Sequence, residues 1–121
     1  MPDPWHILAE IADERQRQVD IEGNTPSMDD NEGNAQLARA AAAYAIHSAE
    51  STYSDQGTGA LFRSIARRVW PWSEDWYKPK DPRRNLIRAG ALIVAEIERL
   101  DRAAARATST PDPGEADGAA R

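Results

Sequence analysis

The side chains of this chain best suited to bind a ligand lie between Trp70 and Arg84. Three of the four tryptophans fall at the start of this stretch, and lysines and arginines follow them. Indole rings stack on flat ligands, while ammonium and guanidinium groups donate hydrogen bonds to phosphate or carboxylate. The stretch therefore predicts a site for a flat, anionic, nucleotide-like small molecule. The predicted ligand-binding residues are Trp70, Trp72, Trp76, Tyr77, Lys78, Lys80, Arg83 and Arg84.

A structural interpretation of the same stretch stays open. Tryptophans in small proteins are often buried for packing, so these rings could instead form a lid over a helical core. The binding interpretation gains from the expected helix start at Asp81 and Pro82, because the first turn of a helix exposes backbone N–H groups that attract anions. Binding of this kind requires no catalytic residue and no cofactor.

A second set of residues suggests metal chemistry. Carboxylates from two helices can hold Mg²⁺, which binds phosphates and activates water. The metal ligands predicted by this alternative are Glu10, Glu14, Glu98 and Asp101. Arginines flank the last two, so ordinary surface ion pairs are the competing interpretation.

The run from Glu14 to Gln18 is dense in hydrogen-bond donors and acceptors. On a helix Glu14 and Gln18 share a face, since they are one turn apart. One interpretation is a solvent-exposed face with local ion pairs, which usually contribute little. The other is a polar seam that contacts the Asp-rich segment 23–34, which is expected to be a loop, or the segment Lys78–Lys80.

Four helices are expected to position these residues. Asp3 with Pro4, and Asp81 with Pro82, each combine a good N-cap with a residue suited to the first turn. Apolar periodicity supports helices over about 4–22, 34–51, 60–69 and 82–105. Prolines in the Trp-rich stretch should interrupt the helix between the last two.

Apolar residues at helical spacing indicate how these helices pack. In the first helix they are Ile7, Leu8, Ile11, Ala12 and Val19. In the second, one face holds Leu37, Ala40, Ala41, Tyr44, Ala45 and Ser48. The last helix has a broad stripe, typical of a central and well-covered helix, made of Leu86, Ala89, Gly90, Ile93, Ile97 and Leu100 and widened by Ile87, Ala91 and Val94. Gly90 inside this stripe predicts a tight crossing with another helix.

Composition and charge narrow the class of protein. The chain has 121 residues, a net charge of −5, 40% hydrophobic residues and no cysteine. The acidic balance argues against generic coating of nucleic acid, and the absence of thiols excludes disulfides and Cys-ligated zinc. No apolar run reaches membrane-spanning length and no signal-peptide pattern is present, so a cytoplasmic location is the default expectation.

The expected fold is all-α. We expect a single domain over 1–107, a compact bundle of about four helices with a long Trp/Pro-rich loop. The composition of 108–121 predicts a disordered tail. So small a core gains by sharing a face with a second copy, which predicts a homo-oligomer.

Several short blocks in this sequence form a recognisable pattern. They are Glu14-Arg15-Gln16-Arg17-Gln18, Glu22-Gly23, Thr25-Pro26, Asp29-Asp30, Trp70-Pro71-Trp72, Trp76-Tyr77-Lys78-Pro79-Lys80-Asp81 and most of Arg88–Arg102. In their order and residue identities they resemble a family of small uncharacterised proteins encoded by bacteriophages and prophages. The chain departs from that pattern at Met28, Gln36 and Asn85, where relatives often carry His, an acidic residue and Asp. Each departure removes a potential metal ligand or acid–base group.

The resemblance implies a phage setting, and hence the cytoplasm of a host cell, but no settled reaction. In that setting, binding a nucleotide-like molecule would sequester a signalling nucleotide of host defence. One alternative is Mg-dependent hydrolysis of nucleotide pyrophosphates, by distant similarity to all-helical MazG-type enzymes, although their paired Glu-Glu motif is missing here. The other is a protein–protein inhibitor of a host defence complex, in which the acidic surface imitates nucleic acid.

Overall fold

The computed structural model describes residues 3–23, 26, 36–49 and 58–109. This part of the chain is all-α, as the sequence predicts, and contains four α-helices and no strand. The helices are α1 (Pro4–Asp20), α3 (Gln36–Ser48), α5 (Thr58–Val69) and α6 (Pro82–Ser109), with a short 3-10 helix, η2 (Glu74–Trp76). Among these helices none is long and apolar enough to cross a membrane.

Both expected helix starts are confirmed. Asp3 Oδ1 accepts the backbone N–H of Trp5 at 3.0 Å, and Asp81 Oδ1 accepts that of Arg84 at 2.9 Å. These caps satisfy donors that the first turn otherwise leaves unpaired. At its other end α6 continues through Ser109, so the first two residues of the predicted tail are helical. The rest of that tail and most of the predicted loop 23–34 lie outside the described residues.

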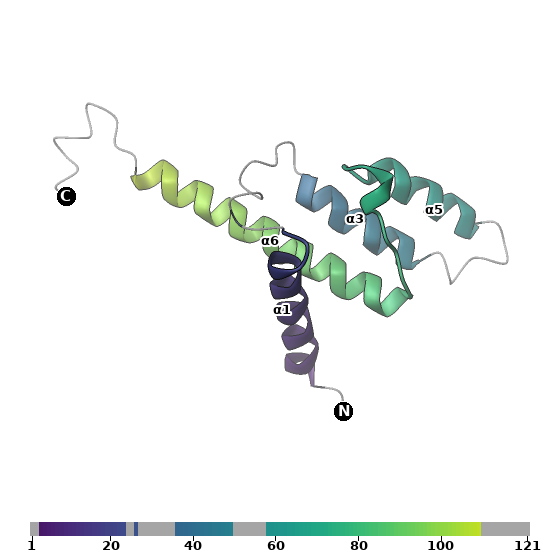
Figure 1. The fold of residues 1–121 in the computed structure, drawn as a ribbon, viewed down its shortest axis with the longest axis horizontal. Coiled ribbons are helices and arrows are strands. Elements are labelled where there is room, and N and C mark those ends of the chain that lie inside the picture. The colour runs from purple at the N-terminus through teal and green to yellow at the C-terminus, as the bar shows by residue number, and fades with distance from the viewer. Residues whose placement is uncertain (1–2, 24–25, 27–35, 50–57, 110–121) are drawn as a thin grey trace.

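The core lies along α3. This helix packs against α6 on one side and α5 on the other (Figure 1). Alanines at the contact keep the helices close, and Ala40 and Ala43 are completely buried. The face expected for this helix is largely confirmed, because Leu37, Ala41 and Tyr44 are buried with them. Ala45, in contrast, is exposed.

The apolar periodicity of α1 does not mark its buried face. Ile7, Leu8 and Ala12 are exposed, whereas Glu14 and Gln18 are buried. In Figure 1, α1 crosses α6 at a steep angle, and α6 is its main packing partner. At such a crossing only a short stretch of helix is covered, and here its fully buried side chains are polar, while Ile11 is only partly buried. The run from Glu14 to Gln18 is therefore a polar seam, and its partner is α6.

Gly90 lies where α1 crosses α6. A Cβ at this position would come within 2.9 Å of Ile11 Cδ1, so the predicted tight crossing is confirmed. The rest of the expected stripe is only partly covered. Among its members Ala89, Ile87 and Ala91 are buried, but four large side chains are about half exposed: Leu86, Ile93, Ile97 and Leu100. They stay exposed because α3 packs on a different face of α6, the one that carries Leu92 and Ala95.

Gln36 and Asn85 have structural roles in the Trp-rich region. Gln36 Oε1 accepts the indole N–H of Trp72 at 2.9 Å. Asn85, which is buried, accepts the backbone N–H of Lys80 at 2.6 Å and donates to its carbonyl oxygen at 3.0 Å. An ionised Asp could accept here but could not donate. These two amides hold the Trp-rich loop, residues 70–81 between α5 and α6, near both of its ends.

Candidate ligand-binding site

A hollow of about 790 Å³ lies where α1, α3, α6 and the Trp-rich loop meet. Its volume is within the range of small-molecule sites, roughly 300–1,000 Å³. The wall combines aromatic rings with charged and polar side chains. It is formed by Glu14, Arg17, Gln18, Ile21, Glu22, Gly23, Tyr44, Trp70, Trp72, Ser73, Trp76, Lys78, Arg88 and Leu92.

The aromatic wall contains both fixed and accessible rings. Trp70 is 8% exposed and meets Tyr44 and Trp72 edge to face, with ring centroids 5.5 and 5.2 Å apart. Its indole N–H donates to the carbonyl oxygen of Ser73 at 2.9 Å. Trp76 has no such cover and is 67% exposed. The loop therefore packs over the core at Trp70 and presents an accessible ring at Trp76.

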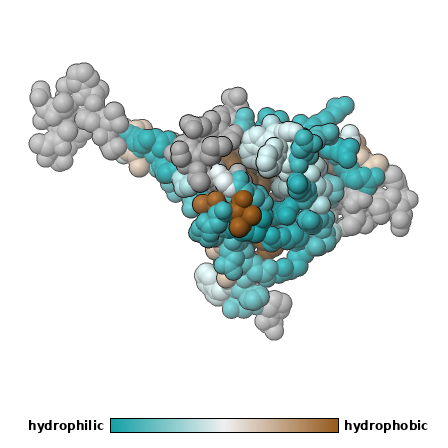
Figure 2. All heavy atoms as spheres, viewed as in Figure 1, coloured by the Kyte–Doolittle hydropathy of each residue, from teal (hydrophilic) through white to brown (hydrophobic). Residues whose placement is uncertain are grey.

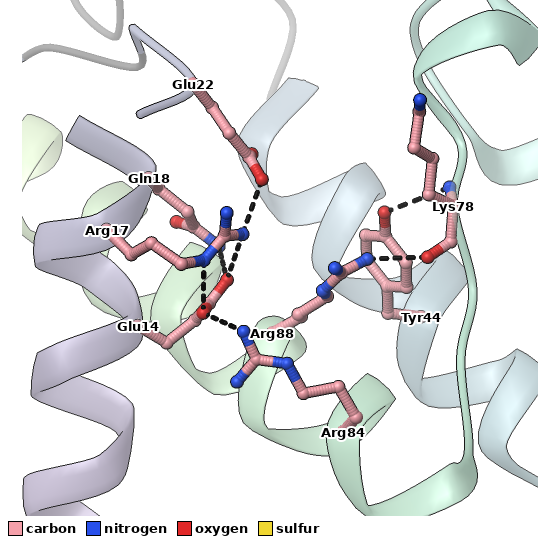
Figure 3. A network of polar contacts seen from close by, with 8 residues as sticks. All are labelled: Glu14, Arg17, Gln18, Glu22, Tyr44, Lys78, Arg84 and Arg88. Atoms are coloured by element: carbon pink, nitrogen blue, oxygen red, sulfur yellow. Dashed lines mark hydrogen bonds and ion pairs between the residues drawn. The ribbon is translucent and has the colours of Figure 1, made fainter. Parts of the chain in front are cut away.

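A buried carboxylate organises the α1 side of the hollow. Glu14 is 2% exposed and accepts two hydrogen bonds of 2.8 Å from Arg17 and another from Arg84. Arg17 also pairs with Glu22, so its guanidinium lies between two carboxylates (Figure 3). Burial raises the pKa of Glu14, but the Arg17 hydrogen bonds and the charge of Arg84 outweigh it and lower the pKa below its ordinary value of 4.5. Glu14 is thus ionised at neutral pH.

The opposite wall is held together by Arg88, Tyr44 and Lys78 (Figure 3). Arg88 Nη1 donates to the carbonyl oxygen of Lys78 at 2.5 Å, and its guanidinium carbon lies 5.8 Å from the centre of the Tyr44 ring. The Tyr44 hydroxyl accepts the backbone N–H of Lys78 at 3.3 Å. These contacts hold the part of the Trp-rich loop around Lys78 against α3 and α6.

Two buried polar atoms on the wall lack a hydrogen-bond partner among the described residues. They are Arg88 Nε, a donor, and Gln18 Oε1, an acceptor. Buried polar groups in folded proteins are nearly always paired, and an unpaired one costs about 1–3 kcal/mol. Both residues line the hollow, but the two unpaired atoms are themselves covered by neighbouring groups.

Half of the predicted ligand-binding residues reach the hollow: Trp70, Trp72, Trp76 and Lys78. Arg83 instead pairs with Glu10, at 2.8 and 2.7 Å, and Arg84 pairs with Glu14. The backbone N–H of Arg84, expected to attract an anion at the helix start, is already bound by Asp81. Lys80 is exposed and does not line the hollow.

Tyr77 supports the aromatic wall from behind. Its ring lies 4.9 Å from that of Trp70, and its hydroxyl is 2.8 Å from His47 Nδ1. Burial, together with the nearby Tyr44, raises the pKa of Tyr77 to about 12. Tyr77 therefore stays neutral at physiological pH.

The four carboxylates of the magnesium alternative do not converge. Glu10, Glu14 and Glu98 are each paired with an arginine, the last with Arg15 at 3.0 Å. Within the described ranges no three His, Asp or Glu side chains are grouped as metal ligands would be. The arrangement found is a set of ion pairs that joins α1 to α6.

Sequence reasoning missed the polar half of the site, which consists of Arg17, Gln18, Tyr44 and Arg88. Arg88 carried a usable signal, because it follows Arg84 by one helical turn and so shares its face. Arg17 and Gln18 belong to the polar run Glu14–Gln18, for which one interpretation is contact with Lys78–Lys80, but they are not among the predicted ligand-binding residues. The local sequence does not single them out, because α1 and the loop are brought together by α6.

Comparison with known proteins identifies no relative. No family model matches the chain, and no curated protein or solved structure is significantly similar to it.

Proposed function

We propose that this chain binds a nucleotide-like small molecule of low negative charge in the hollow. The observation that carries the proposal is the wall itself, where the accessible indole of Trp76 lies in the same hollow as cationic side chains. A flat base would stack on Trp76, and an anionic group would lie near Lys78 and Arg88. Stacking on an aromatic ring contributes roughly 1–3 kcal/mol per base.

The charge of the wall limits the ligand. Three cationic side chains, Arg17, Lys78 and Arg88, face two carboxylates, Glu14 and Glu22, which leaves an excess of one positive charge. A surface that tracks a polyphosphate or a nucleic-acid strand needs a larger cationic excess. The balance therefore favours a ligand with one phosphate over one with several.

The biological role that we propose is sequestration of a host defence signal by a phage or prophage accessory protein. It is supported by the resemblance of the sequence blocks to phage-encoded proteins. Sequestration needs affinity alone, so it is compatible with a wall that contains no clustered metal ligands among its described residues. The hydrolase alternative has no comparable support, because three of its four carboxylates, Glu10, Glu14 and Glu98, are held in ion pairs.

We also propose that the chain forms a homodimer. Ile93, Ile97 and Leu100 follow one another on α6 at spacings of four and three, and each is about half exposed. This spacing is typical of a seam that packs against another helix. Within the chain, α1 contacts this stripe at Gly90. The same stripe on a second copy is its natural complement, because a two-fold axis brings identical faces together.

A thermal-shift screen against a panel of nucleoside monophosphates, with and without Mg²⁺, tests the binding proposal. A ligand that binds only the folded state at 100 times its Kd stabilises it by about 2.7 kcal/mol. We expect a shift that does not need Mg²⁺, with no phosphate release. Lys78→Met should reduce it, and Lys80→Met is the matched control, because both lysines are exposed but only Lys78 lines the hollow.

Two results would contradict the proposal. One is the absence of a shift with every nucleotide, in which case co-purification with a host protein would favour the inhibitor alternative. The other is an equal loss with Lys78→Met and Lys80→Met, which would place the ligand elsewhere.

A further inference from the structure

The two helices α3 and α5 contain basic residues and no acidic ones. Their arginines are Arg39, Arg63, Arg67 and Arg68, and neither helix contains an aspartate or a glutamate. The chain as a whole has a net charge of −5, so positive charge is concentrated in this pair of helices. Because α5 packs on the side of α3 away from α6, its outer face is open to another molecule (Figure 1).

A groove of about 390 Å³ lies on this outer face of α5. Residues four apart are neighbours on a helix surface, so Arg63 and Arg67 form a ridge. The row beside that ridge begins with two small side chains, Ala60 and Ser64, and ends at Arg68. All five residues line the groove and are exposed. We call it the basic groove, since it has a floor of small side chains and a rim of guanidinium groups.

The structure of α5 itself accounts for only part of this charge. Arg67 lies in the last turn together with Arg68, where cations interact favourably with the helix dipole. Arg39 Nε donates to the carbonyl oxygen of Val69, at the end of the helix, at 3.1 Å. Arg63 lies before the last turn, and a like charge follows it four residues later, which is unfavourable in a helix. An anion between Arg63 and Arg67 would offset this repulsion.

We infer that the basic groove binds a helical segment of another protein that carries carboxylates one turn apart. A ridge of the partner helix lies on Ala60 and Ser64, whose small side chains allow a close approach. Its carboxylates then reach Arg63 and Arg67 on the rim. Guanidinium groups bind carboxylates through two parallel hydrogen bonds. Arginine is enriched at protein interfaces whereas lysine is depleted, and α5 contains three arginines and no lysine.

Nucleic acid fits this face less well than an acidic helix does. Surfaces that bind single strands combine cationic groups with aromatic rings on which the bases stack. The one aromatic residue of α5 is Phe62, which is partly buried and does not line the basic groove. A long polyanion would also be repelled by the net negative charge of the chain, whereas a short acidic helix contacts α5 alone.

Fluorescence anisotropy with two labelled helical peptides of glutamate and alanine, at low ionic strength, tests this inference. One peptide has its glutamates on a single face, four residues apart, and the other has the same composition with its glutamates spread around the helix. We expect the single-face peptide to bind about fivefold more tightly, the effect of one or two exposed ion pairs. Arg67→Glu should raise its Kd at least about tenfold, because like charges then face each other.

Arg106→Glu is the matched control for that variant. Arg67 and Arg106 are both exposed and both lie in the last turn of a helix. The last turn of α6, however, belongs to the end that extends away from α5 (Figure 1). The Kd of the single-face peptide should therefore change little in Arg106→Glu. If Arg67→Glu does not fold, Arg67→Gln replaces it, with an expected rise in Kd of about threefold for one lost ion pair.

Several outcomes would overturn the inference. Absence of binding, or equal affinity for the two peptides, would show that the groove does not recognise an acidic helix. Equal losses in the Arg67 and Arg106 variants would place the peptide elsewhere. Tighter binding of a deoxythymidine oligonucleotide of the same charge would assign the groove to nucleic acid instead. None of these results bears on nucleotide binding beside Trp76, because no residue of α5 lines that hollow.

Discussion

Glu14 connects the stability of the chain to the shape of its hollow. It is the buried acceptor for both Arg17 and Arg84, and those two arginines come from different helices. Burying a carboxylate is unfavourable unless several donors satisfy it, as they do here. Its ionisation therefore has two consequences, since it fixes α1 on α6 and sets the position of one cationic group on the wall.

Glu14→Gln should destabilise the fold and weaken its acid dependence. Removing one partner of a buried pair costs about 3 kcal/mol, the lower end of the usual range because both arginines are partly exposed. The folded-state pKa of Glu14 is lowered, so its stabilisation is present above about pH 4.5 and is lost as pH falls through the folded pKa. Urea unfolding at pH 7 and at several values below 4.5 would measure this.

Glu10→Gln is the control for that experiment. The hydrogen bonds from Arg83 lower the pKa of Glu10, but this ion pair is exposed, so the loss at pH 7 should be small. Equal losses for the two variants would contradict the role given to Glu14.

At the scale of elements, the sequence predicts most of the buried face of α3 but not that of α1, for a physical reason. In α3 the apolar residues also form the packing surface, so periodicity alone identified most of the buried face. In α1 the packing surface is charged, and its partners Arg84 and Glu98 lie far away in the sequence. Local periodicity contains no information about such partners. For the same reason Lys78 could be assigned to the site from its neighbours, while the ion pairing of Arg84 could not be foreseen.

The crossing of α1 over α6 depends on the missing side chain at Gly90. Gly90→Val should destabilise the fold by about 1–3 kcal/mol, because the added carbons collide with Ile11. Ile11→Ala in the same chain should recover part of that loss, since it removes the side chain that is struck. A double-mutant cycle measured by chemical unfolding isolates this coupling. Additive effects of the two substitutions would show that the helices do not touch there.

At the scale of the whole molecule, apolar side chains remain outside the core. On the face shown in Figure 2 most of the surface is hydrophilic, and a small hydrophobic group lies near the end of α1 that faces the viewer. The half-exposed stripe of α6 is longer and belongs to a helix that extends past its neighbours (Figure 1). Exposed apolar stripes of this kind are typical of surfaces that bind another chain.

The homodimer proposal is tested by the molar mass in solution. We expect twice the chain mass by light scattering, and the mass of one chain for Ile97→Asp, because a charge in the seam must be desolvated on association. Leu61→Asp is the matched control, since Leu61 is similarly exposed but lies on α5. A single-chain mass for the unmodified protein would contradict the proposal, without affecting ligand binding.

Tryptophan fluorescence tests nucleotide binding in the hollow most directly. Trp5 is 73% exposed and does not line the hollow, so Trp5→Phe leaves three tryptophans that all line it. We expect adenosine monophosphate to quench this emission saturably, and an added Arg88→Met substitution to raise the Kd at least about tenfold, because a buried charged donor is lost. Emission that stays unchanged up to millimolar nucleotide would contradict the binding site described above.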